Sequence, residues 1–293
     1  MPEAIPAQGA PLAELLGEAA RHRIGRLESQ LLLLHALGVP PQEAAARRGW
    51  LLAHGDTHAD PAQVERFRQL VEAHRDGLPL AYARGWQAFH GLWLKVDQRV
   101  LIPRSDTETL VDWALDRLAG MPPPQRVLDL GTGSGAIALA LKKACPSARV
   151  IGLDRSRDAL AVASANAATL NLDIELRWGD WLQGLDGSFD LIVSNPPYVA
   201  AQDPHLQALS DEPIEALVAG PDGLDDIRTL VRDAGARLVP GGMLMLEHGW
   251  DQAPAIRALL AEHGYGGIET RRDLAGHERC SGAVMRPAAA IDR

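Results

Sequence analysis

The stretch VLDLGTGSGAIALAL, residues 127–141, joins an apolar, strand-like run to a helix-like run through a glycine-rich turn. In this order the turn brings the backbone close to a ligand at the N-terminus of a helix, where unpaired N–H groups point outward. The turn also satisfies the dinucleotide pattern G-x-G-x-x-G/A, because Gly131, Gly133 and Ala136 have the required spacing. It therefore predicts a nucleotide-like cofactor without deciding between cofactor classes.

Strand-like and helix-like runs alternate from residue 105 onward. The runs ARVIGLD at 148–154 and FDLIVS at 189–194, for example, are separated from their neighbours by helical patterns such as DALAVASANAATL at 158–170. Alternation of this kind predicts an α/β fold, a doubly wound and mostly parallel sheet with helices on both faces. We assign this predicted domain to residues 105–293.

The chain before residue 105 has two other patterns. Residues 1–77 carry apolar positions at helical spacing, interrupted at residues 38–41 and at Gly55 and Asp56, which predicts a small all-helical domain. Between residues 78 and 104, aromatic and β-branched residues alternate around WLKVD and RVLIP. This part predicts a β-hairpin that links the two domains.

The composition excludes several classes of protein. With 293 residues and 46% hydrophobic content the chain can bury a large core, and its formal charge of −9 argues against tight, nonspecific nucleic-acid binding. No apolar run approaches the about 20 residues that cross a bilayer, and no charged segment followed by an apolar one marks a signal peptide. Two cysteines cannot build a disulfide framework. We expect a soluble, cytoplasmic protein without stable nucleic-acid or membrane binding.

Polar residues follow two further strand-like runs. Asp154 ends the run after the glycine turn, where a carboxylate can accept hydrogen bonds from both hydroxyls of a ribose. Asp180 and Trp181 follow the third run, where an adenine ring would lie, with the acid near its exocyclic amine and the indole near its face. Asp180 also fits a helix N-cap and Trp181 a core aromatic. In an open α/β sheet, however, ligands bind at the carboxyl ends of the strands, where all these residues fall.

The sequence Asn195-Pro196-Pro197-Tyr198 follows the apolar run FDLIVS. Two prolines stiffen the main chain and remove two donors, so that carbonyl acceptors are held without competing N–H groups. A carboxamide or amine NH₂ can donate one hydrogen to the Asn195 side-chain oxygen and one to the Pro196 carbonyl, while Tyr198 covers its flat face. An ordinary Pro-Pro turn with a turn-forming Asn is the alternative.

These residues resemble the class I S-adenosylmethionine-dependent methyltransferases, and within them the amino-methyltransferases that carry (N/D)PP(Y/F/W). A narrower resemblance covers nearly the whole chain through LIPRSDTE at 101–108, SNPPYV at 194–199 and EHGWDQ at 247–252. With these motifs the chain resembles the release-factor glutamine methyltransferases of the HemK or PrmC type. The resemblance implies a seven-stranded, Rossmann-like sheet and methylation of the side-chain amide nitrogen of glutamine. The implied target is the Gly-Gly-Gln motif of class 1 peptide-chain release factors.

The resemblance also implies site residues. S-adenosylmethionine is expected on the cofactor residues, which are Gly131, Thr132, Gly133, Ser134, Gly135, Asp154, Asp180, Trp181 and Asn195. The substrate glutamine is expected on Asn195, Pro196, Pro197 and Tyr198, of which Asn195, Pro196 and Tyr198 are the candidate catalytic residues. Arg104 and Glu108 are expected near the methionine end of the cofactor, although DTE also fits the first turn of a helix. The helical domain is expected to recognise the release factor.

Other readings stay open at this point. A sister family methylates a glutamine of a ribosomal protein. Ser105 is a departure toward that sister family, because the release-factor enzymes more usually have proline at this position. An exocyclic amine of a nucleic acid would also fit the NPPY motif, but the acidic charge argues against it. A nicotinamide oxidoreductase leaves NPPY unexplained, and a non-catalytic adaptor leaves Asn195 and Tyr198 without a purpose. No histidine falls into HExxH or a Cys/His spacing. His54 and His58 share helical spacing but lie in a Gly-Asp-rich loop, so we expect no metal.

Overall fold

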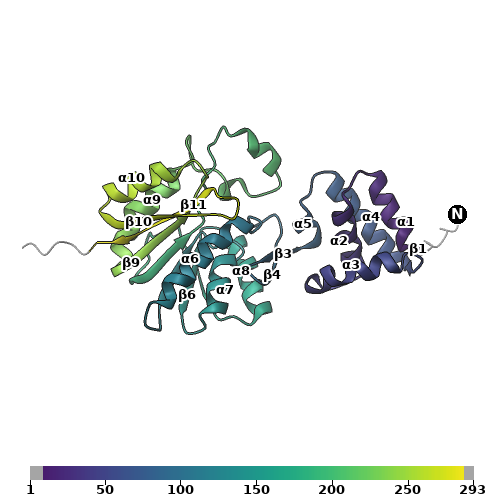
Figure 1. The fold of residues 1–293 in the computed structure, drawn as a ribbon, viewed down its shortest axis with the longest axis horizontal. Coiled ribbons are helices and arrows are strands. Elements are labelled where there is room, and N and C mark those ends of the chain that lie inside the picture. Colours follow the sequence, from purple (N-terminus) through teal and green to yellow (C-terminus); the bar gives the residue numbers. More distant parts are fainter. Residues whose placement is uncertain (1–8, 287–293) are drawn as a thin grey trace, which may run out of the picture. The chain divides into compact units, whose positions relative to one another are not determined.

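A computed structural model describes residues 9–286 of the chain. Its contacts divide the chain into two compact units, which part between Trp86 and Gln87 (Figure 1). Among the described residues no helix combines the length and apolar character needed to cross a membrane. The finer division into residues 1–77, 78–104 and 105–293 stays a prediction. Residues 1–8 and 287–293, at its two ends, lie outside the described residues.

The first unit is helical, as its sequence pattern predicts. Its helices are α1 (Leu12–Arg21), α2 (Arg26–Ala36), α3 (Ala44–Ala53), α4 (Pro61–Arg75) and α5 (Leu80–Arg84), with a 3₁₀ turn η1 (Pro41–Glu43) and a short bridge of β1 (Ala10–Pro11) with β2 (His58–Ala59). Leu15, Leu33 and Phe67 are fully buried in its core. Asp60 caps α4 by accepting a hydrogen bond from the Gln63 backbone at 2.8 Å, which fixes where that helix begins.

The predicted hairpin forms from β3 (Trp86–Phe89) and β4 (Leu92–Lys95), but the region from 78 to 104 differs from the sequence reading in two places. The helix α5 precedes the hairpin, and the segment RVLIP at 99–103 is not a strand. Pro103 has no N–H, and the backbone N–H of Ile102 donates to the side chain of Glu212 at 3.0 Å. The Ile102 N–H is therefore hydrogen-bonded to a side chain, whereas in a β-strand it would be hydrogen-bonded to the backbone of a neighbouring strand.

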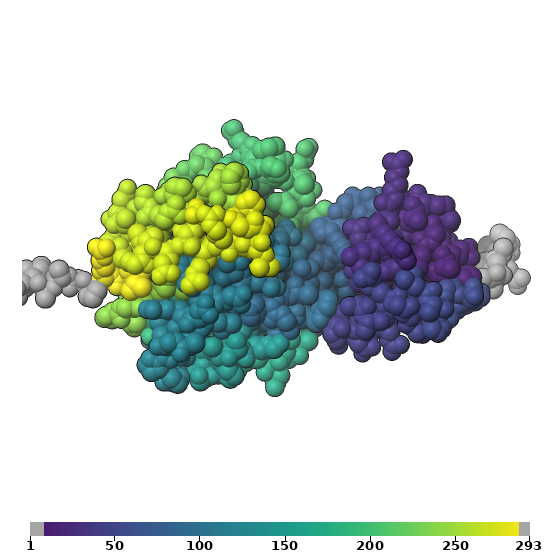
Figure 2. Space-filling view, viewed as in Figure 1, coloured from purple at the N-terminus to yellow at the C-terminus, as the bar shows by residue number. Residues whose placement is uncertain are grey.

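The second unit contains a seven-stranded sheet in the order β10-β11-β9-β8-β5-β6-β7. The strands are β5 (Arg126–Leu130), β6 (Arg149–Asp154), β7 (Glu175–Trp178), β8 (Phe189–Ser194), β9 (Leu238–Glu247), β10 (Tyr265–Arg272) and β11 (Glu278–Met285). The five strands from β9 to β7 are parallel, and β10 and β11 add an antiparallel pair beside β9. This pair, yellow in Figure 2, lies at the surface of the second unit.

Helices cover both faces of the sheet (Figure 1). On one face lie α6 (Glu108–Ala119), α7 (Ala136–Ala144) and α8 (Arg157–Leu170), and on the other lie α9 (Asp225–Ala234) and α10 (Ala253–Glu262). Successive strand residues alternate between the two cores, so that Val127 packs under the first group and Leu128 under the second. Burial on both faces explains why these strands read as continuous apolar runs. The doubly wound fold predicted from the sequence is confirmed.

Candidate active site

The glycine turn between β5 and α7 adopts a conformation that side chains would strain. Gly131, Gly133 and Gly135 have φ values of 69°, 54° and 84°, in the left-handed region. The backbone N–H groups of Gly131 and Thr132 both donate to the carbonyl of Leu153 on β6, at 2.9 and 3.0 Å. The turn is thereby tied to the neighbouring strand at its carboxyl end.

Asp129 braces the same turn from inside the protein. Its Oδ2 accepts hydrogen bonds from the Thr132 hydroxyl at 2.6 Å and from the Ala138 backbone at 3.1 Å. Burial raises the pKa of the Asp129 carboxyl to about 7, although the two hydrogen bonds oppose the shift. Asp129 is not among the predicted site residues, although an acid within an otherwise apolar strand is a signal in the sequence.

Asp154 joins the turn at the end of β6. One of its oxygens accepts from the Gly133 backbone and the other from the Ser156 backbone, both at 2.8 Å. Burial raises the pKa of the Asp154 carboxyl, while these hydrogen bonds lower it. A carboxylate oxygen has more than one lone pair, so Asp154 can accept further hydrogen bonds from a ligand.

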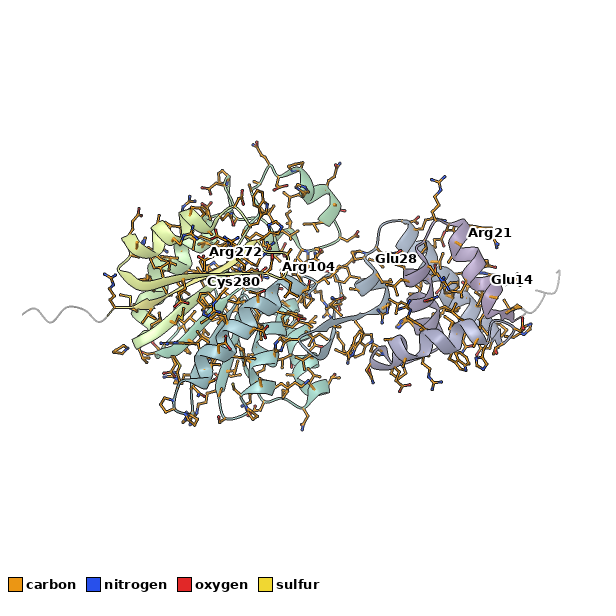
Figure 3. The ribbon with its side chains drawn as sticks, viewed as in Figure 1. Glu14, Arg21, Glu28, Arg104, Arg272 and Cys280 are labelled. Atoms are coloured by element: carbon orange, nitrogen blue, oxygen red, sulfur yellow. The ribbon has the colours of Figure 1, made fainter. Side chains whose placement is uncertain are left out.

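One cavity is lined by residues at the carboxyl ends of β5, β6, β7 and β8. Its wall includes seven of the predicted site residues, which are Gly131, Gly133, Asp154, Asp180, Trp181, Asn195 and Pro197. The other predicted residues, Thr132, Ser134, Gly135, Pro196 and Tyr198, are not on this wall. Arg104 and Glu108 do not line it either. Arg104 (Figure 3) pairs with Glu212, and Glu108 accepts from the His90 backbone at 2.8 Å.

Trp181 forms a flat side of the cavity. A Cβ built on Gly131 would lie 3.5 Å from the Trp181 ring, so the indole stands directly against the glycine turn. The indole N–H donates to Asp226 on α9 at 3.1 Å, which fixes the plane of the ring. Trp181 is therefore oriented by a side chain that the sequence pattern did not associate with it.

Two segments that the sequence analysis did not assign to the site complete the wall. Residues 99–101 lie on it together with Pro213, Glu215 and Ala216. Buried Glu212 ties these segments to each other, since it accepts from the Ile102 backbone and pairs with Arg104. A second tie runs from the Arg155 guanidinium to the carbonyl of Glu215, at 2.8 Å. This part of the cavity wall is thus held by side chains far apart in the sequence.

The NPPY segment begins where β8 ends. The side-chain amide of Asn195 donates to the Thr107 hydroxyl at 3.2 Å, in the short 3₁₀ turn η2 (Ser105–Thr107) before α6. Tyr198 donates through its hydroxyl to Glu247 at 3.3 Å, and its carbonyl accepts from Gln252 at 3.0 Å. Both ends of the NPPY segment are therefore bound to other parts of the second unit.

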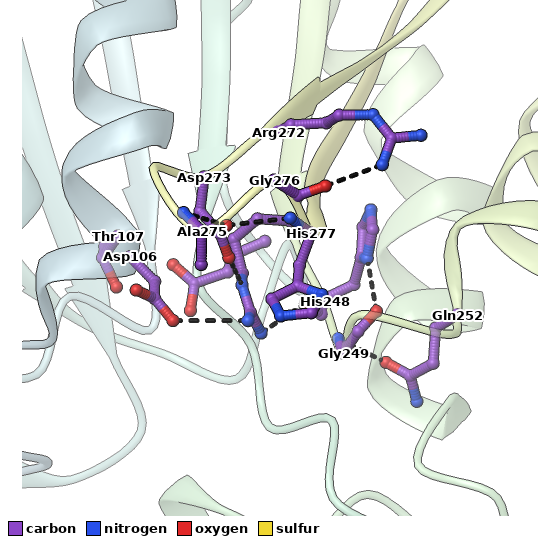
Figure 4. Close-up of polar contacts among 12 residues, drawn as sticks. Asp106, Thr107, His248, Gly249, Gln252, Arg272, Asp273, Ala275, Gly276 and His277 are labelled. Carbon is purple, nitrogen blue, oxygen red and sulfur yellow. Dashed lines mark hydrogen bonds and ion pairs between the residues drawn. The ribbon is translucent and has the colours of Figure 1, made fainter.

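Charged side chains lie near Glu247, the residue that accepts the hydrogen bond from Tyr198. Arg279 on β11 forms ion pairs with Asp106 at 3.3 Å and with Asp273 at 3.1 Å (Figure 4). Burial raises the pKa of the Glu247 carboxyl to about 7, and the charge of Arg279 opposes the shift. Across residues 9–286 there is no cluster of His, Cys, Asp and Glu side chains that would hold a metal ion.

Comparisons with known proteins place this site in a family. The Methyltransferase small domain family matches residues 110–219, and the PrmC N-terminal domain family matches residues 9–85. A Thermus thermophilus 16S rRNA methyltransferase in complex with AdoMet and guanosine has a similar fold, with a TM-score of 0.51 and 22% identity over 69% of this chain and 50% of its own.

Curated relatives cover most of the chain. A release factor glutamine methyltransferase of Bordetella pertussis is 46% identical over 264 residues, which are 89% of this chain and 95% of the relative. One of Escherichia coli, of the same name, is 41% identical over 272 residues, which are 92% of this chain and 95% of the relative. The chain belongs to the release factor glutamine methyltransferase family.

Proposed function

We propose that this enzyme transfers a methyl group from S-adenosylmethionine to the side-chain amide nitrogen of the glutamine in the Gly-Gly-Gln motif of class 1 peptide-chain release factors. The observation that carries the proposal is the position of Asn195. Its side chain lies on the same cavity wall as Asp154 and the glycine turn, and its amide is oriented by Thr107. An acceptor for a substrate amide and the acceptors for a nucleoside thus share one cavity.

The cavity residues fit the cofactor. Asp154 has lone pairs for two ribose hydroxyls, and the fixed indole of Trp181 offers a face for adenine, with Asp180 on the same wall for its exocyclic amine. Gly131 and Gly133 have backbone conformations that a side chain would strain. Because glycine has no side chain, the backbone of the turn is open to a ligand. Bound there, S-adenosylmethionine would supply an electrophilic methyl group and a good leaving group.

The protein's task is to make the amide nitrogen nucleophilic. An amide nitrogen is a poor nucleophile because its lone pair is delocalised into the carbonyl. The Asn195 side-chain oxygen and the Pro196 carbonyl would accept the two N–H hydrogens of the substrate, which favours a localised lone pair. These two acceptors would also stabilise the positive charge that develops on nitrogen as the methyl group arrives.

The orientation of Asn195 supports this role. Because its NH₂ donates to Thr107, its oxygen is the end left to accept a hydrogen bond. Pro196 and Pro197 have no N–H groups that would compete for the same acceptors. The substrate glutamine alone gives little specificity, so we assign recognition of the release factor to the N-terminal helical unit.

The test uses labelled S-adenosylmethionine and two forms of a purified class 1 release factor, one intact and one with the Gly-Gly-Gln glutamine changed to alanine. We expect label on the intact factor only, which would identify both the reaction and the target residue. Absence of label from both, with cofactor binding demonstrated by calorimetry, would contradict the proposal. A ribosomal-protein glutamine and a nucleic-acid amine would then be assayed as acceptors.

A further inference from the structure

Glu247, the last residue of β9, is a buried acid beside the NPPY segment. Its side chain is 1% exposed, and Oε1 accepts the hydrogen bond from the Tyr198 hydroxyl. Its Oε2 has no hydrogen-bond partner among the described residues. An unpaired carboxylate oxygen inside a protein costs folding free energy, and an apolar side chain of similar size would avoid that cost. A purely structural role therefore explains Glu247 poorly.

The surroundings of Glu247 lead to both ends of the NPPY segment. On one side Tyr198 donates to it directly. The Thr107 hydroxyl lowers the pKa of the Glu247 carboxyl, although these two side chains form no hydrogen bond in the structure. The same hydroxyl oxygen accepts from Asn195, so its own hydrogen can be given to Glu247. The carboxylate is thus bonded directly to Tyr198, and its unpaired oxygen is available to the hydroxyl that holds Asn195.

Charged and titratable groups on two other elements, β11 and η2, face Glu247. Arg279 of β11 lowers its pKa and Asp106 of η2 raises it, but Arg279 is engaged by Asp106 and Asp273 and forms no ion pair with Glu247 among the described residues. Cys280, also on β11, lies opposite Glu247 in the strand pairing and is a buried thiol. Glu247 is therefore influenced by a cation without being neutralised by it.

We propose that Glu247 is a positioning residue of the methyl transfer. In this role it sets Asn195 through Thr107 and sets Tyr198 directly, so that both are in place before the substrate amide arrives. The inference rests on the proposed function and adds a residue to it. Since Tyr198 and Thr107 are both donors, the ionised carboxylate holds them more strongly than the protonated acid does. Turnover should therefore rise with pH through the titration of Glu247.

The first test is Glu247→Gln, which keeps the size of the side chain and removes its charge. We expect kcat to fall about tenfold, because a charge-assisted hydrogen bond is replaced by a neutral one. The affinity for S-adenosylmethionine should stay unchanged, since Glu247 does not line the cavity. The rise of wild-type kcat near neutral pH should be absent from the variant. Wild-type kcat and an unchanged pH profile in the variant would overturn the proposal.

A second variant covers the case in which Glu247→Gln fails to fold. Thr107→Val keeps the shape of the side chain and removes the hydroxyl that holds Asn195 and lowers the pKa of the Glu247 carboxyl. We expect a similar loss of kcat from Thr107→Val alone. Where Glu247→Gln does fold, the double variant should lose less than the product of the single losses, because both act on one network. Thr169→Val is the matched control, since that hydroxyl donates to the Ala165 carbonyl on exposed α8 surface. Independent, multiplicative losses would count against a shared network.

The same assays separate this inference from the proposed function. If the wild-type enzyme places no label on the release factor, the proposed function fails. If the wild type methylates and Glu247→Gln methylates equally well, only the role of Glu247 fails. A variant with a lower melting temperature, but with wild-type kcat per folded molecule, would show that Glu247 serves folding alone and would also overturn the inference.

Discussion

The side-chain amide of Asn195 donates a hydrogen bond to the hydroxyl of Thr107, with 3.2 Å between Nδ2 and Oγ1. Asn195 follows β8 and Thr107 precedes α6, so the contact links the end of a central strand to the start of a covering helix. The contact fixes which end of the Asn195 amide is available to a substrate. Groups oriented before the reaction need no reorganisation during it, which is where an enzyme gains most from hydrogen-bond partners.

Asn195→Ala should leave the fold intact and lower turnover roughly 100-fold, because loss of one preorganised partner at a centre of developing charge costs about 3 kcal/mol. The measurement is the rate of methyl transfer at saturating substrate, with the melting temperature as a check on folding. Near-normal turnover in a folded variant would remove Asn195 from the catalytic centre.

Asp154→Ala should weaken the binding of S-adenosylmethionine by about 1.5–3 kcal/mol, the cost of losing hydrogen bonds to a charged acceptor. The variant also frees the Gly133 N–H from its present partner, which adds to the loss. Isothermal calorimetry measures the effect. Asp158→Ala is the matched control, since Asp158 is an exposed acid in the first turn of α8 and lies off the cavity wall. Equal affinities in the two variants would contradict the assignment.

Gly223→Ala should lower turnover because of its contact with the NPPY segment. Gly223 has a φ of 74°, and a Cβ there would overlap the Tyr198 carbonyl. Gly184 has a φ of 66° with open space around it, so Gly184→Ala carries the conformational strain alone. Both variants should lose about 1–2 kcal/mol of stability from that strain. Only Gly223→Ala should also lose activity, and equal turnover in the two would refute this explanation.

Asp129→Asn should change how stability depends on pH. Because the pKa of Asp129 is raised from 3.8 to about 7, the folded protein holds a proton that the unfolded chain releases. The stability that this proton contributes is present below about pH 4 and is lost as pH rises through about 7. An asparagine oxygen can still accept from Thr132 and Ala138, without a buried charge.

The melting temperature of Asp129→Asn relative to the wild type should therefore rise between about pH 4 and pH 7 and level off above that. Glu247 titrates in the same window, but it is present in both proteins and cancels from the difference. Melting curves at several pH values test the prediction. A difference that does not vary with pH would mean that the Asp129 carboxyl is not held protonated in the folded state.

Much of the site follows from a local rule that the sequence already displays. Gly131, Asp154 and Asn195 each come directly after a buried apolar run, and parallel strands bring such ends to one edge of a sheet. Glu247 carries the same signal, since it closes the apolar run of β9. Its contact with Tyr198 is visible only in the structure, because the two residues lie far apart in the sequence and neither motif indicates the other.

Other features depend on contacts between distant segments and could not be read locally. The segment RVLIP has the alternation of a strand, yet its N–H at Ile102 is taken by Glu212. The cavity wall around Pro213 and Ala216 has no periodicity or motif that marks it. In both places the conformation depends on a contact between residues far apart in the sequence. Residue propensity and motif spacing carry information only about residues that are close in the sequence.

The strand β11, which pairs with β9 beside Glu247, is the last of the described elements to be synthesised. Cys280 of β11 pairs with Glu247 across the sheet, and Arg279 brings the cation that lowers the pKa of that acid. A nascent chain thus contains the NPPY segment well before its support is complete, with the edge of β9 open and a carboxylate still without its neighbour. Premature termination or proteolysis before β11 would leave a chain that has every predicted site residue but lacks the strand that pairs with Glu247.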